Sequence, residues 1–162
     1  MSYLPYPDPV YDVEGGERSG VYRPTTTPPD VANPSGTTVH YLATGAGTAG
    51  QLGLYRWEMG PGRSGPDPHF HRSITESFYV LSGTIRLFDG SDWVDGTTGD
   101  FLYVPQGGLH GFRNESGEPA TMLILFTPGA PREDYFERVG TTKDMTEADR
   151  EEFFLRHDTF WA

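Results

Sequence analysis

Hydrophobic and polar residues alternate through the middle of the chain, in short segments separated by glycine, proline and aspartate. Alternation with a period of two is typical of strands with one buried face. At least eight short strands with turns between them indicate a β-sandwich or a closed barrel. The segments that we expect to be strands are 37–43, 52–59, 77–81, 84–88, 91–94, 101–104, 109–113 and 121–126.

Turn residues predict how some of these strands connect. Ser82-Gly83 is expected to join 77–81 and 84–88 as a hairpin, and Asp89-Gly90 is a two-residue turn signal before the next strand. These strands and turns together predict an all-β fold.

Residues 45–50 satisfy the dinucleotide-binding pattern G-x-G-x-x-G. That motif works when a helix follows it, because the helix N-terminus binds the pyrophosphate. Here the pattern predicts another strand, 52–59. We therefore interpret residues 45–50 as a glycine-rich hairpin loop.

The two ends of the chain lack the strand pattern of the middle. We therefore expect three parts: a proline-rich arm over 1–36, a barrel over 37–127 and a helical segment over 128–162. Residues 1–36 hold seven of the fourteen prolines and predict an extended arm, lying across the domain or a second subunit, with a flexible leader as the alternative. After Pro128, two short helices are expected, one over 131–138 and one beginning at Thr146 as N-cap. They are expected to pack on the end of the barrel, where they could cover a cavity.

Composition narrows the classes of partner. The chain has a formal net charge of −11, which argues against nucleic acid as a ligand. No segment has the apolar length of a membrane span, and no signal-peptide pattern is evident, so a cytoplasmic location is expected. With no cysteine, a metal would have to be bound by nitrogen and oxygen ligands.

Three of the five histidines fall in two patterned stretches. His69 and His71 share a face of an extended segment, Glu76 follows shortly, and His110 would come from an adjacent strand once a barrel closes. Three imidazoles and a carboxylate suit a divalent transition metal, with Fe, Mn, Ni, Co and Zn all compatible. The other two, His40 and His157, are interpreted as structural or surface residues.

These stretches resemble the two motifs of the cupin superfamily. The first is His69-x-His71-x4-Glu76-x6-Gly83, although the upstream Gly62 stands one residue early. The second is Gly99-x5-Pro105-x-Gly107-x2-His110-x3-Asn114. The resemblance implies a double-stranded β-helix (jelly-roll) barrel with one divalent metal per chain bound by His69, His71, Glu76 and His110, and a homodimer as the usual assembly.

The C-terminal segment is loosely similar to that of single-domain bacterial quercetinases (flavonol dioxygenases). This likeness implies a metal-dependent oxygenase acting with dioxygen on an aromatic or enolic small molecule, such as a flavonol or a polyketide-like phenol. The alternatives are an oxygen-independent isomerase, decarboxylase or cyclase on the same scaffold, and a non-catalytic protein that binds a small molecule.

The quercetinase likeness also implies that Glu76 is the catalytic base as well as a ligand. Its pKa would then need to approach the working pH, and apolar neighbours such as Phe78 and Val80 could raise it. Thr75 and Asn114 are candidates for supporting the ligands, with a purely structural role as the alternative for Asn114. Aromatic residues that could line a cavity, or simply form the core, are Tyr55, Trp57, Phe101, Tyr103 and Phe112.

Overall fold

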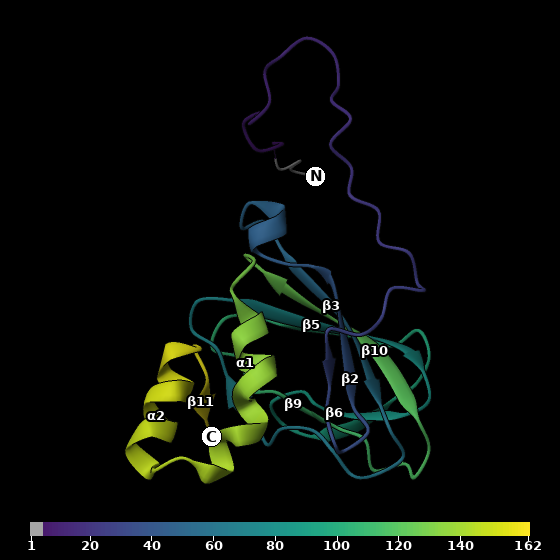
Figure 1. The fold of residues 1–162 in the computed structure, drawn as a ribbon, viewed down its shortest axis with the longest axis vertical. Coiled ribbons are helices and arrows are strands. Elements are labelled where there is room, and N and C mark those ends of the chain that lie inside the picture. The colour runs from purple at the N-terminus through teal and green to yellow at the C-terminus, as the bar shows by residue number, and fades with distance from the viewer. Residues whose placement is uncertain (1–4) are drawn as a thin grey trace.

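The structure, a computed structural model, describes residues 5–162 and consists mainly of antiparallel strands (Figure 1). Residues 1–4, at the start of the expected arm, lie outside the described residues. The strands are β1 (Val31–Ala32), β2 (Thr38–Ala43), β3 (Gly53–Met59), β4 (His69–Phe70), β5 (Thr75–Ser82), β6 (Ile85–Phe88), β7 (Trp93–Gly96), β8 (Phe101–Val104), β9 (Gly111–Arg113), β10 (Ala120–Thr127) and β11 (Phe160–Trp161). The helices are α1 (Arg132–Arg138) and α2 (Glu147–Arg156), with 3-10 turns η1 (Ala46–Thr48) and η2 (Val139–Asp144).

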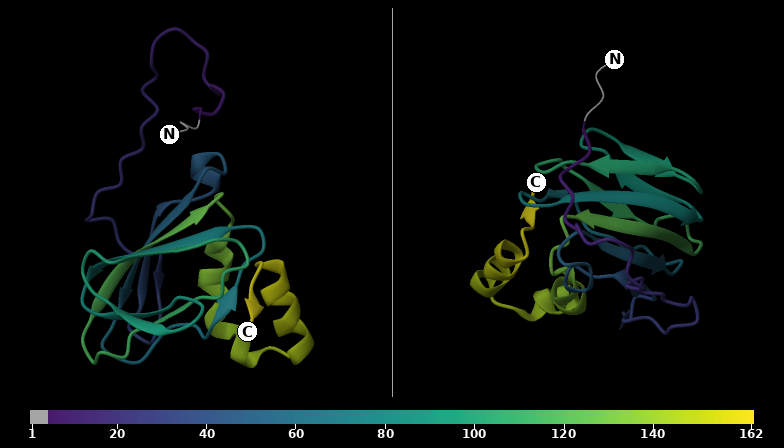
Figure 2. Two further views of the ribbon diagram at one scale, coloured as in Figure 1. Left: turned by 180° about the vertical axis from the view of Figure 1, so that it is seen from behind. Right: turned by 90° about the horizontal axis from the view of Figure 1, so that it is seen from above.

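The strands form two main sheets and a short pair. The larger sheet has the order β1-β2-β3-β10-β5-β8, the smaller has the order β7-β6-β9, and β4 pairs with β11. Figure 2 shows the strands from behind and from above. The expected all-β class with C-terminal helices is confirmed.

A single apolar core lies between the sheets. Alternate residues of β10 are buried, namely Met122, Ile124 and Phe126. Ile85 and Leu87 of β6 belong to the same buried cluster. Because each fully buried side chain of this size contributes about 1.5–3 kcal/mol, this cluster fixes which face of each strand turns inward.

The expected hairpin between 77–81 and 84–88 is wrong. Both edges of β5 are already paired, with β10 on one side and β8 on the other, so β6 enters the other sheet. Gly83 has φ +73° and turns the chain from one sheet to the other. Consecutive strands are neighbours only in most cases, and here the corner at Gly83 separates them.

The strand expected over 91–94 begins later, at Trp93. The side chain of Asp89 accepts hydrogen bonds from the backbone N–H groups of Ser91 and Asp92, so residues 89–92 form the turn. The loop over 45–50 connects the antiparallel strands β2 and β3, as predicted.

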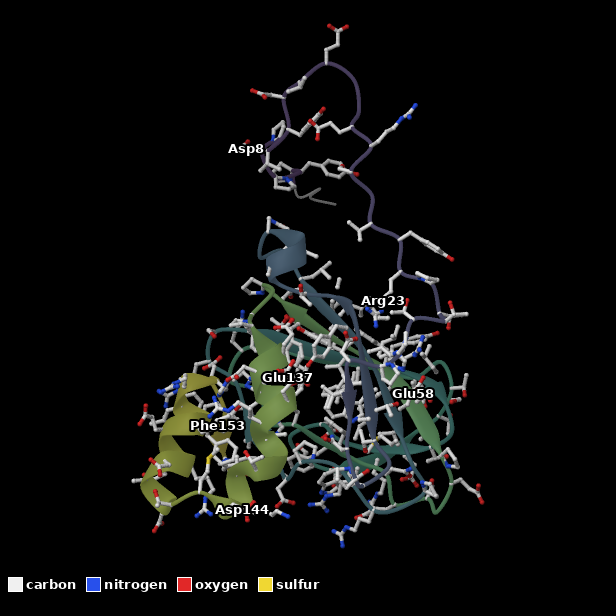
Figure 3. The ribbon with its side chains drawn as sticks, in the orientation of Figure 1. Asp8, Arg23, Glu58, Glu137, Asp144 and Phe153 are labelled. Atoms are coloured by element: carbon white, nitrogen blue, oxygen red, sulfur yellow. The ribbon has the colours of Figure 1, made fainter. Side chains whose placement is uncertain are left out.

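The two C-terminal helices share the core of the barrel. Tyr55 is fully buried, and its hydroxyl donates a hydrogen bond to Glu133 of α1 at 2.7 Å. Phe153 points from α2 toward α1, where its ring stacks on Tyr135 (Figure 3). Thr146 caps α2 by accepting a hydrogen bond from the backbone N–H of Asp149, as expected.

Residues 5–22 are exposed and run away from the sheets, with Asp8 far from the barrel (Figure 3). Tyr6, Val10 and Tyr22 are almost fully exposed. The segment rejoins the fold at β1, which pairs with β2. Its role stays a prediction. Among residues 5–162, no helix has the length and apolar character needed to cross a membrane.

Candidate metal centre

The backbones of His69 and His110, which are distant in sequence, are paired at the candidate site. The N–H of His69 donates to the carbonyl of His110 at 2.9 Å, and the N–H of His110 donates back at the same distance. This bridge places His110 opposite β4. Glu76 reaches the same place from the inner face of β5.

The four side chains converge as the resemblance implied. One ligand atom from each lies within 4.8 Å of the others, and all four residues are buried. Nε2 of His110 lies 2.7 Å from Oε2 of Glu76, and Nε2 of His71 lies 3.1 Å from the same oxygen. The group is therefore compact enough for a single ion.

Backbone carbonyls fix the orientation of all three rings. Nδ1 of His69 lies 2.9 Å from the carbonyl of Asp67, Nδ1 of His110 lies 2.9 Å from that of Gly108, and Nδ1 of His71 lies 2.5 Å from that of Asp158. A carbonyl oxygen only accepts, so each Nδ1 carries a proton. In a neutral ring the lone pair is then on Nε2.

This protonation pattern tests whether the residues fit a metal. Neutral rings would direct the Nε2 lone pairs of His71 and His110 at Glu76, which as a carboxylate is also only an acceptor. A positive charge is needed among these atoms, as an extra proton or as a cation. Imidazoles held by a second hydrogen bond are typical metal ligands, so the donor set fits a divalent transition metal.

The pKa values reflect burial and this close contact. Burial would raise the pKa of Glu76, but His110 and His71 outweigh burial and lower that pKa well below its usual range. Burial lowers the pKa of His69 to about 4. For His110, burial is outweighed by Glu76, which raises the imidazole pKa. Burial acts in the expected direction, but the histidines outweigh it, so the expected rise of the Glu76 pKa toward the working pH is wrong.

A cavity of about 360 Å³ adjoins the site, with His69 and Glu76 in its wall. Both sheets and the C-terminal segment contribute aromatic side chains, so the helices do border a cavity. This volume lies near the lower end of the range for small-molecule sites. The aromatic lining residues are Trp57, Phe112, Phe126, Tyr135, Phe136, Phe154 and Trp161.

Two of the five aromatic candidates line this cavity, Trp57 and Phe112. Tyr55 is a core residue, as the alternative interpretation held. Phe101 and Tyr103 are 62% and 55% exposed and lie on the outer face of the larger sheet, because Leu102 and Val104 take the other face of β8.

The two proposed supporting residues serve the backbone. Asn114 is fully buried; its amide donates to the carbonyls of Gly60 and Glu118, and its oxygen accepts from Ser116. The hydroxyl of Thr75 donates to the carbonyl of Thr127 at 3.1 Å and lies 2.7 Å from the hydroxyl of the same residue. Neither makes a hydrogen bond to the four candidate ligands, so the structural alternative holds for Asn114.

The remaining histidines, His40 and His157, lie outside the group of four candidate ligands. Nε2 of His40 lies 3.2 Å from Glu58, and Nε2 of His157 lies 2.8 Å from Asp134.

Sequence patterns missed two residues that matter at the site. Asp158 holds His71 through its carbonyl, and Arg132 is buried in the cavity wall. No local pattern identifies either, because both act through contacts distant in sequence.

Comparisons with known proteins give one consistent family. Residues 55–126 match the family model described as "Cupin domain". Quercetin 2,3-dioxygenase of Bacillus subtilis is 32% identical over 72 residues, which cover 44% of this chain and 21% of the relative. The chain therefore spans about a fifth of the length of that curated relative.

Two solved structures are similar over the barrel. The polyketide cyclase RemF of Streptomyces resistomycificus is 25% identical with a TM-score of 0.53, covering 66% of this chain and 77% of that one. KdgF from a Halomonas species is 18% identical with a TM-score of 0.57, covering 66% of this chain and 91% of that one. The second likeness concerns the fold alone, and both agree with the expected jelly-roll barrel.

Proposed function

Because the chain belongs to the cupin superfamily, we propose that it is a metal-dependent oxygenase acting on an aromatic or enolic small molecule. The substrate class would be a flavonol or a polyketide-like phenol, with dioxygen as co-substrate. The family and a buried group that could bind a metal support the enzyme class. The proposed ligands of one divalent transition metal (Fe, Mn, Ni, Co or Zn) are His69, His71, Glu76 and His110.

When bound, the ion would supply Lewis acidity and lower the pKa of a substrate hydroxyl. Glu76 would be the base that accepts the proton of that hydroxyl at a carboxylate oxygen. Its lowered pKa keeps it ionised at neutral pH but makes it a weak base. A weak base of this kind requires an acidified hydroxyl, so the two roles depend on each other.

The cavity walls would bind and orient the substrate. Trp57, Phe112 and Phe126 present rings beside the site, and flat aromatic molecules stack favourably on such rings. Because β5, β10 and α1 all contribute to the walls, a bound substrate would exclude water from Glu76.

The observation that favours an oxygenase is the likeness to quercetin 2,3-dioxygenase, at 32% identity over 72 residues. The experiment is oxygen uptake by metal-loaded protein with a panel of flavonols and phenolic polyketides. We expect oxygen consumption that matches substrate loss. Turnover that continues under strict anaerobiosis would contradict an oxygenase.

A second candidate is an oxygen-independent cyclase, isomerase or decarboxylase that uses the same residues. The observation that favours it is the likeness to the polyketide cyclase RemF. Anaerobic turnover in the same assay would identify this class. A ligand that binds without turnover in either atmosphere would favour a non-catalytic binding protein.

We also propose that the protein is a homodimer. Four large apolar residues on β5 and β8 form an exposed surface at the edge of the larger sheet: Tyr79, Leu81, Phe101 and Tyr103. Exposed apolar surfaces of this kind often bind another protein chain. Light scattering should give the mass of two chains, and a monomer would contradict the proposal. A cytoplasmic location stays a prediction.

A further inference from the structure

Arg132 carries a buried charge with few partners. Its side chain is 4% exposed and lies in the wall of the cavity that contains His69 and Glu76. Nη1 donates a hydrogen bond to the carbonyl of His157 at 2.6 Å. Nε is buried and has no hydrogen-bond partner among the described residues.

No acidic side chain forms an ion pair with this guanidinium, although the carboxylates of Glu76 and Asp158 lie near enough to favour its charge. Within residues 5–162, no carboxylate oxygen lies within 4.0 Å of Arg132. Three rings surround it instead, with centroids 4.2 Å (Tyr135), 5.3 Å (Phe126) and 5.7 Å (Phe136) from Cζ. Contact with ring faces offsets only part of the cost of removing a charge from water, and arginine stays protonated.

A buried cation that faces a cavity is best compensated by an anion inside that cavity. The planar guanidinium matches a carboxylate or another anionic oxygen in geometry as well as in charge. The aromatic rings beside it match an apolar ring system on the same ligand.

We propose that Arg132 binds an anionic oxygen of the cavity ligand, a carboxylate or a deprotonated enol or phenol, and thereby selects ligands that carry a negative charge. This inference rests on the proposed function in that both place the ligand in the same cavity. It adds a determinant of specificity on α1, outside the four candidate metal ligands.

The competing explanation is that Arg132 only braces the structure. Its bond to the carbonyl of His157 joins α1 to the segment containing Asp158, which orients His71. A brace needs the Nη1 bond alone. It does not account for the buried Nε without a hydrogen-bond partner or for a buried charge without a close ion pair. The two explanations differ in whether Arg132 discriminates between charged and neutral ligands.

The test is calorimetric titration of metal-loaded protein with 2-naphthoate and with its neutral counterpart, 2-naphthamide. We expect the wild type to bind the carboxylate at least about tenfold more tightly than the amide, as charge-assisted hydrogen bonds would give. Arg132→Met should remove this preference, and Arg132→Lys should retain part of it because it keeps the charge. Arg138→Met, on the exposed side of the same helix, should leave it unchanged.

Equal binding of the two probes by the wild type would overturn the proposal. So would an Arg132→Met protein that binds both probes more weakly by the same factor, since that is the result of a brace alone. If Arg132→Met does not fold, Arg132→Gln, which removes the charge, can be compared with Arg132→Lys, which keeps it. An unchanged preference for the carboxylate in Arg132→Gln would overturn the proposal. A titration with 2-naphthol, at pH values on either side of its own pKa, separates a phenolate from a carboxylate as the preferred anion.

The His110→Ala protein separates this inference from the proposed metal site. A carboxylate preference that survives in this variant would support Arg132 as the anion-binding group, even if elemental analysis found no metal in the wild type. A preference that disappears in His110→Ala but persists in Arg132→Met would mean that the anion binds at the metal site instead. That result would overturn the role of Arg132 and leave the proposed function standing.

Discussion

The backbone carbonyl of Asp158 accepts a hydrogen bond from Nδ1 of His71 at 2.5 Å, across 87 positions of the chain. The carboxylate of Asp158 also accepts from the backbone N–H groups of Arg72 and Ser73. The segment after α2 therefore holds both the ring of one candidate ligand and the backbone that follows it. Partners of this kind fix the tautomer of a metal-ligating histidine.

Removing the Asp158 side chain should weaken metal binding without removing a ligand. Asp158 has φ +51°, which glycine adopts without strain, so Asp158→Gly deletes only the carboxylate contacts. Because the carbonyl that contacts His71 remains, we expect metal affinity to fall by up to roughly tenfold, the lower end of the effect of losing such support. Competition with a chelating dye measures the fall. Asp144→Gly, at an exposed position, is the matched control. Equal affinities in the two variants would show that the carboxylate of Asp158 does not contribute to metal binding.

The same carboxylate predicts a pH dependence of stability. Burial would raise the pKa of Asp158, but hydrogen bonds from Ser73 and Arg72 outweigh burial and lower it below the usual 3.8. A lowered pKa means that the stabilisation is present above pH 3.8 and is lost as the pH falls through the lower, folded-state pKa. Denaturant unfolding of metal-free protein should therefore show wild type more stable than Asp158→Asn at pH 6. The difference should shrink below pH 3.8, and a difference that grew on acidification would contradict this sign.

The Glu76→Gln variant distinguishes the proposed role of Glu76 as a base from its role as a metal ligand. Glutamine keeps the shape and one ligand oxygen but cannot accept the substrate proton at neutral pH. If Glu76 is the base, kcat should fall by about 100-fold or more, while elemental analysis shows a smaller loss of metal. Parallel losses of metal and of turnover would reduce Glu76 to a ligand only.

Gly83 is required by the corner between the two sheets. At φ +73° a Cβ would lie 2.5 Å from the carbonyl oxygen of Pro119. Gly83→Ala should therefore cost more than the roughly 1–2 kcal/mol of left-handed backbone strain, measured as a lower free energy of unfolding. Gly62→Ala is the control, because no atom lies within 4 Å of its added Cβ. Similar stability of the two variants would contradict this account of the corner.

The sequence predicts individual strands better than their partners. Period-two alternation placed β8 at Phe101–Val104, as the structure has it. The pairing of β5 was missed because it depends on β10, which lies some forty residues further along the chain. Local patterns contain no information about which of two sheets a strand joins.

The same limit applies to the site. The cupin motifs identified as candidate ligands the four buried residues that converge in the structure. The residues that orient and accompany them were not predictable, because Asp158 and Arg132 lie in the C-terminal segment and meet the site through contacts distant in sequence. The pKa of Glu76 was predicted in the wrong direction because Phe78 and Val80 were considered without the histidine rings that contact the carboxylate.

Elemental analysis of protein purified without chelators shows whether the four converging side chains bind one metal ion. We expect about one transition metal per chain in the wild type and the loss of most of it in His110→Ala, because an open site with three remaining ligands binds far more weakly. His40→Ala, which changes a buried histidine outside the group, should keep its metal. Wild-type protein without metal after supply of Fe, Mn, Ni, Co and Zn, or a His110→Ala protein that retains a full equivalent, would contradict the account.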